Sequence, residues 1–132
     1  MRVLAVFTLL LCSGCATWSG ETQAEESAWL ALHTADAVQT AQFQYEPGMQ
    51  EDESRWAIGA RPSTRSVVVY FAAEALMHAA VTEYLEAHGA PRWARRLWQG
   101  VWLADAGRDV YDNAQLMPIV IAKRPAVEPR QQ

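Results

Sequence analysis

The chain has very little cysteine, and all of it lies at one end. Only two of the 132 residues are cysteines, Cys12 and Cys15. Residues 16–132 therefore contain no thiol that could form a disulfide, a cysteine-based metal site or a cysteine nucleophile. If this part of the chain folds in an oxidising compartment, packing alone must hold it together.

Other signatures of function are also missing. Residues 16–132 contain no glycine-rich phosphate loop, no nucleophile elbow and no zinc-protease signature. The formal net charge is -4 and becomes about -5 if Arg2 is removed with a signal peptide. An acidic balance of this kind argues against nucleic acid, or an anionic membrane surface, as an electrostatic partner.

The N-terminus has the order of a secretory signal. Arg2 supplies a positive charge, residues 3–11 form a largely apolar run, and small residues then lead to Cys15. The run has about nine residues, roughly half of the ~20 that a membrane-spanning helix needs. These residues therefore predict export rather than a transmembrane anchor.

The segment Leu11-Cys12-Ser13-Gly14-Cys15 resembles the lipobox of bacterial lipoproteins, with cysteine at position 12 where leucine is usual. The resemblance implies that residues 1–14 are cleaved and that Cys15 carries diacylglycerol and an N-acyl chain such as palmitate. Each buried methylene of an acyl chain adds about 0.8 kcal/mol to membrane binding. Because Ala16 rather than aspartate follows the cysteine, the resemblance implies the outer membrane, facing the periplasm. The alternative is an ordinary signal peptide with an incidental cysteine.

The remaining sequence predicts an all-α protein, a compact bundle of three main helices. We expect a polar tether over residues 15–26, a helical domain over 27–117 and an extended or disordered tail over 118–132. Within the tail, residues 119–121 are apolar and β-branched, which suits a short strand or an extended cover over the bundle.

Three helices are expected from the positions of capping residues, glycine and proline. The first runs from Glu25 to about Tyr45, after a segment from Thr22 that has the spacing of a capping box. The second, over about 63–87, is the most apolar. It is expected as a buried core helix, and insertion in the bilayer is the alternative. The third runs over about 91–116 and ends before Pro118.

The third helix begins with several cations. Arg92, Arg95 and Arg96 lie in its first turns, which is the unfavourable end of the helix dipole for positive charge. Either they form a solvated basic edge, or they face a phosphate or the acidic segment 51–53.

Each expected helix carries a pair of ionisable residues three or four positions apart, so that both lie on one face. The pairs are His33 with Asp36, Glu74 with His78, and Asp105 with Asp109. If the three faces converge, these six side chains form either a buried polar network tied off by Arg108, a divalent-metal site, or an acid–base pair. The Glu-x-x-His spacing of di-iron bundles is absent.

Two short stretches resemble a group of small proteobacterial membrane proteins and lipoproteins with no assigned activity. The first comprises residues 29–33 and Asp36-Ala37-Val38-Gln39-Thr40. The second is Ile58-Gly59-Ala60-Arg61-Pro62-Ser63. The residues Glu53-Ser54 resemble the start of that group's Glu-Ser-Asn-Pro turn, although Arg55-Trp56 replaces Asn-Pro. The resemblance implies a helical, membrane-associated protein.

These observations lead to one expected function and two alternatives. We expect a non-catalytic binding or scaffold module, anchored to membrane lipid through Cys15, with a protein partner at the envelope and no cofactor. The first alternative is a metal-binding or enzymatic domain built on His33, Asp36, Glu74, His78, Asp105 and Asp109. The second is a helical protein embedded in the membrane.

Overall fold

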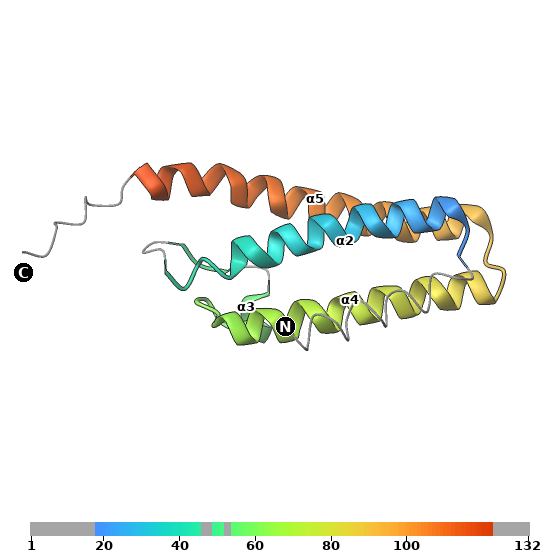
Figure 1. Ribbon diagram of the computed structural model, residues 1–132, viewed down its shortest axis with the longest axis horizontal. Helices are drawn as coiled ribbons and strands as arrows, with labels where there is room; N and C mark the ends of the chain where they lie inside the picture. Colours follow the sequence, from blue (N-terminus) through green and yellow to red (C-terminus); the bar gives the residue numbers. More distant parts are fainter. Residues whose placement is uncertain (1–17, 46–48, 52–53, 123–132) are drawn as a thin grey trace, which may run out of the picture.

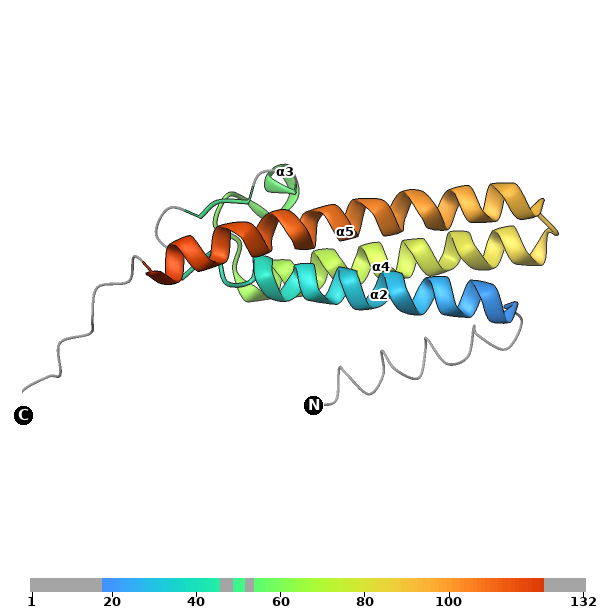
Figure 2. The same cartoon turned by 90° about the horizontal axis from the view of Figure 1, so that it is seen from above.

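The computed structural model describes residues 18–45, 49–51 and 54–122. Three long helices lie side by side, and each runs antiparallel to the next along the chain (Figure 1 and Figure 2): α2 (Gly20–Thr40), α4 (Thr64–Ala87) and α5 (Arg92–Ala122). The short helix α3 (Arg55–Ile58) lies at the end of the bundle opposite the turn from α4 to α5. The predicted all-α bundle of three main helices is confirmed.

Serine caps and one glycine set the ends of the helices. The Ser19 hydroxyl accepts a hydrogen bond from the Thr22 amide at the start of α2, and Ser63 caps α4 in the same way through the Ser66 amide. At the other end of α4, Gly89 has φ 62°, and the Ala90 amide donates to the Leu85 carbonyl at 2.9 Å. This left-handed turn satisfies the last carbonyls of α4, because glycine adopts it without a steric penalty.

The core lies where α2 meets the other two long helices. Trp29 of α2, Ala75 of α4 and Ala106 of α5 are buried together, and Leu32 and Trp102 pack against them. The contacts of α2 with α5 are the most extensive, whereas α4 and α5 touch each other least. The helix α2 therefore holds the bundle together, and the side between α4 and α5 remains more open.

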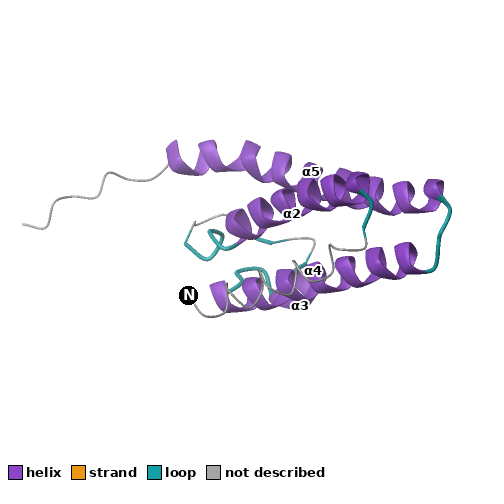
Figure 3. Cartoon of the chain, turned by 45° about the vertical axis from the view of Figure 1, so that its right-hand side comes forward, coloured by secondary structure: helices purple, strands orange, loops and turns teal. Residues whose placement is uncertain are grey.

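Three predicted boundaries were wrong. The first helix begins at Gly20, inside the segment that we expected as a polar tether up to residue 26, because Ser19 rather than Thr22 is its N-cap. It ends at Thr40 and is followed by turns through residue 45 rather than continuing as helix. The third helix continues past Pro118 to Ala122, so residues 119–121 are neither a strand nor an extended cover (Figure 3). Residues 123–132 lie outside the described part.

Much of the apolar surface of the helices faces outward. On α4 the exposed large residues are Val68, Val69, Leu76, Met77 and Tyr84, and on α5 they include Trp93, Leu97 and Val101. The prediction that the second helix is a buried core helix therefore holds for one face of α4 only. Within the described residues, no helix has the length and apolarity that crossing a bilayer requires.

Candidate functional site: an acidic pocket

A pocket of about 290 Å³ opens near the α3 end of the bundle, between the three long helices and the loop that precedes α3. It is called the acidic pocket here. Its floor includes the core residues Trp29, Trp102 and Ala106. Six carboxylates line it, from Asp36, Glu51, Glu74, Asp105, Asp109 and Asp112. A cavity with this lining has the concave shape and convergent polar groups of a ligand site.

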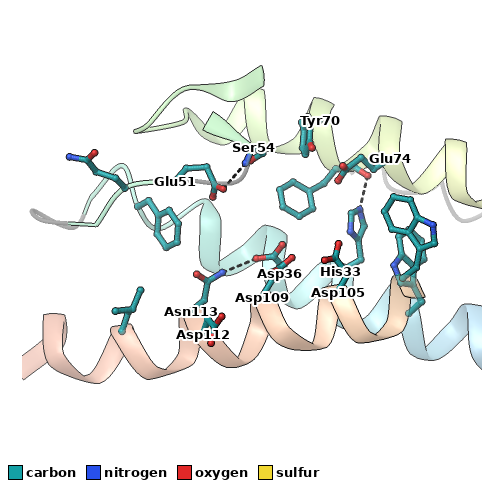
Figure 4. Close-up of a pocket in the computed structure, with 17 residues that line it drawn as sticks. His33, Asp36, Glu51, Ser54, Tyr70, Glu74, Asp105, Asp109, Asp112 and Asn113 are labelled. Carbon is teal, nitrogen blue, oxygen red and sulfur yellow. Dashed lines mark hydrogen bonds between the residues drawn. The ribbon is translucent and has the colours of Figure 1, made fainter. Parts of the chain in front are cut away.

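The carboxylates come from every element around the pocket (Figure 4). Asp36 is on α2, Glu74 on α4, Asp105 and Asp109 on α5, and Glu51 on the loop. Hydrogen bonds from neighbours help to hold several of them, and two examples come from the loop and from α5. The Asn113 side chain donates to Asp36 at 2.8 Å, and the Ser54 amide donates to Glu51 at 3.0 Å.

His33 contributes a neutral ring to the same pocket. Its Nε2 lies 3.0 Å from the backbone carbonyl of Phe71, and because a carbonyl only accepts, Nε2 carries the proton and donates. Burial lowers the pKa of His33 below its ordinary value, although this carbonyl and Glu74 oppose the shift. The ring therefore adds no positive charge to the pocket near neutral pH, and its Nδ1 is an acceptor.

The negative electrostatic potential of the pocket affects Tyr70, which lies one helical turn before Glu74 on α4. Burial raises the pKa of Tyr70 above its ordinary value, and the hydrogen bond to Glu74 and the nearby charges of Glu51 and Asp36 raise it further. A phenol surrounded by carboxylates resists ionisation because a phenolate would add another negative charge. Tyr70 thus remains a neutral donor.

Five of the six side chains predicted to form a cluster do line one pocket: His33, Asp36, Glu74, Asp105 and Asp109. They surround it from three helices. Among the residues that the structure describes, however, no three histidine, cysteine or acidic side chains are placed to hold a metal ion. The arrangement therefore offers a distributed negative potential rather than a coordination sphere.

His78, the sixth predicted residue, lies in a different place. Its ring is fully buried, and its Nδ1 lies 3.0 Å from a carboxylate oxygen of Glu26. The other oxygen of Glu26 accepts from the Thr82 hydroxyl at 3.2 Å and from the Gln99 amide at 2.9 Å. We call Glu26, His78, Thr82 and Gln99 the sealed cluster, because all four are less than a tenth exposed.

The two polar regions meet at Trp29. Two imidazoles stack on its indole: the ring of His33 at 4.6 Å and that of His78 at 3.8 Å between centroids. The His78 ring also stacks on Trp98. The row of rings thus separates the acidic pocket from the sealed cluster.

The arginines at the start of α5 form ion pairs with acidic residues of α2 and α4, so they are not a free basic edge. Arg92 and Arg96 pair with Glu21 at the start of α2, and Arg95 pairs with Glu86 near the end of α4. These ion pairs join the three long helices at the end opposite the acidic pocket. Arg108 lies 3.5 Å from Asp112 in an exposed pair, one turn apart on α5.

Several important residues of the two regions were not predicted from the sequence, although some of them had a detectable signal. Glu26 was placed in the tether, yet it continues the spacing of Trp29, His33, Asp36 and Thr40 backward along one face of α2. Tyr70 lies four residues before Glu74 on α4, which also indicates proximity. Glu51 had no such signal, because it is on an irregular loop.

Comparison with models of protein families, with curated proteins and with solved structures finds no match to this chain. The acidic pocket is therefore interpreted from its own geometry. Cys15 lies outside the described residues.

Proposed function

We propose that this protein is a lipoprotein of the cell envelope, held to the outer membrane by acyl chains on Cys15 and facing the periplasm.

 The lipid anchor is supported by the residues Leu11 to Cys15, whose order resembles a lipobox. The outer membrane is supported by Ala16, because the lipoprotein sorting rule retains proteins elsewhere when aspartate follows the cysteine. More than one acyl chain on Cys15 makes the anchoring durable.

The helical domain is then a non-catalytic binding module, and the observation that carries this role is the acidic pocket. It is a concave site of about 290 Å³ that gathers side chains from α2, α4, α5 and the loop before α3. Most of its polar groups are carboxylates, and its apolar wall is aromatic. This composition suits the capture of a partner or ligand with positive charge.

The anchor is tested by metabolic labelling in a Gram-negative host. The full chain is expressed with labelled palmitate, and its membrane and soluble fractions are separated. We expect label on the wild type and on Cys12→Ser, and no label on Cys15→Ser, which is no longer retained as a mature lipidated protein. The variant Cys12→Ser is the matched control, because it removes the other thiol of the same segment.

Label on Cys15→Ser, or its absence from the wild type, would contradict the anchor. The binding role is tested separately, through the ligand of the pocket.

A further inference from the structure

We propose that the acidic pocket binds an aliphatic ammonium cation, an inference that rests on the proposed role of the helical domain as a binding module and names the chemical class of its ligand. The ammonium group belongs either to a free linear polyamine or to a lysine side chain of a protein partner. Both sources present the same chemistry to the pocket, a charged hydrogen-bond donor at the end of an apolar chain.

The polar lining consists mainly of acceptors. Six carboxylates face the cavity or stand at its rim, and in the described part of the chain no lysine or arginine lines it. Two donors of the lining, Tyr70 and Asn113, are directed to pocket carboxylates, to Glu74 and Asp36 respectively. A ligand that brings donors and positive charge therefore complements the pocket, whereas an anion does not.

His33 provides a second observation, independent of the acidic residues. Its side chain is 7% exposed, and Nε2 is already bonded to the Phe71 carbonyl. Within the described residues Nδ1 has no hydrogen-bond partner, although this atom belongs to a ring that lines the pocket. Nδ1 is not one of the fully buried polar atoms that lack a partner, so it reaches the solvent of the cavity and can accept from a ligand there. An ammonium N–H in the pocket satisfies it.

The aromatic wall distinguishes an organic cation from a metal ion. Trp29, Phe43, Tyr70, Phe71 and Trp102 line the same cavity as the carboxylates. Aromatic faces attract ammonium groups and also pack against methylene chains, whereas a divalent metal requires several oxygens at one point. The carboxylates instead surround a volume that admits a linear amine, and no three of the described acidic or histidine side chains converge on a metal position.

The test is calorimetric titration of the purified, lipidated full chain in non-ionic detergent. The probes are spermidine for a free amine, a trilysine peptide for lysine side chains, and Mg²⁺ for a compact cation of high charge. The test variant is Glu74→Gln, which keeps the shape and the acceptor oxygen beside Tyr70. The matched control is Glu25→Gln, on α2 and outside the pocket lining.

We expect saturable binding of spermidine, or of trilysine if the source is a protein, and weaker binding of Mg²⁺. Loss of one charged acceptor at a partly exposed site raises the dissociation constant by about tenfold in Glu74→Gln. The constant for Glu25→Gln stays within about twofold of the wild type. If Glu74→Gln does not fold, as judged by circular dichroism, Asp105→Asn at the exposed rim replaces it.

The proposal is overturned if neither amine binds, if Mg²⁺ binds at least as tightly as both amines, or if the two glutamine variants weaken binding equally. These outcomes leave the anchor untouched, because palmitate labelling of Cys15 is a separate measurement. Conversely, if the chain binds the amine but takes up no palmitate, the proposal of a lipid anchor is contradicted and the proposal of an ammonium ligand stands.

Discussion

The acidic pocket and the sealed cluster use the same kinds of residue in opposite ways. In the sealed cluster a single carboxylate, Glu26, is surrounded by donors from His78, Thr82 and Gln99. In the acidic pocket six carboxylates line an open volume. Buried charge that is satisfied within the protein joins helices, whereas charge gathered around a cavity is available to a ligand. Trp29 lies between the two regions and packs on a histidine of each.

The largest expected effect comes from removing the carboxylate of the sealed cluster. The substitution Glu26→Leu leaves buried donors on α4 and α5 without their acceptor, and we expect the free energy of unfolding to fall by about 3 kcal/mol. Urea unfolding followed by circular dichroism measures it. The adjacent Glu25→Leu is the control, with an expected change of about 0.5 kcal/mol or less. Equal losses in the two variants would show that the cluster does not hold the helices.

A smaller effect is expected from acidification of His33. Because burial lowers its pKa in the folded state, the unfolded chain binds a proton more readily, so stability is complete above the unfolded pKa of about 6.5 and falls as the pH drops below it. Between pH 7.5 and 5 we expect the wild type to lose about 1 kcal/mol more than His33→Gln.

The control removes a histidine elsewhere, the exposed His88 at the end of α4. The variant His88→Gln should follow the wild type when unfolding is measured by urea at each pH. A wild type and a His33→Gln variant with parallel pH profiles would contradict the burial of a neutral ring.

The smallest expected effect is an increase in the free energy of unfolding, opposite in sign to the effect of Glu26→Leu. Replacing pocket carboxylates by amides, as in Glu74→Gln or Asp105→Asn, relieves repulsion among like charges, so we expect each substitution to raise the free energy of unfolding by about 0.5 kcal/mol. High salt should reduce this gain, because it screens the same repulsion. A loss of stability comparable to that of Glu26→Leu would mean that the pocket carboxylates serve the fold, and the contrast between the two regions would fail.

The sequence predicted the helices better than their ends. Apolar spacing and the positions of Gly89 and Pro91 gave the second helix almost as it is, Thr64–Ala87. The start of α2 was missed because Thr22 and Ser19 are both competent caps, and only the folded helix shows which one is used. Pro118 was expected to stop α5, yet the backbone continues to Ala122. The tendency of proline to end a helix is local, and it is overridden here because the residues on both sides of Pro118 are helical.

The candidate site was predicted in part. Residue spacing placed His33, Asp36, Glu74, Asp105 and Asp109 on faces that do meet around one pocket. Spacing could not separate His78 from them, because Glu74 and His78 lie on the same face of α4. In the folded chain His78 contacts Glu26, which lies two turns before His33 on α2. Loop residues such as Glu51 follow no period, so their place in the pocket emerges only from the folded chain.

The most direct test of the contrast between the two regions is thermal unfolding of the full chain with and without spermidine. A ligand that binds the folded state raises the midpoint of unfolding, and at one ligand concentration a tighter ligand raises it more. The account predicts that spermidine raises the midpoint of the wild type and of Glu25→Gln, and raises that of Glu74→Gln much less. An equal rise in all three proteins, or no rise in the wild type, would contradict it.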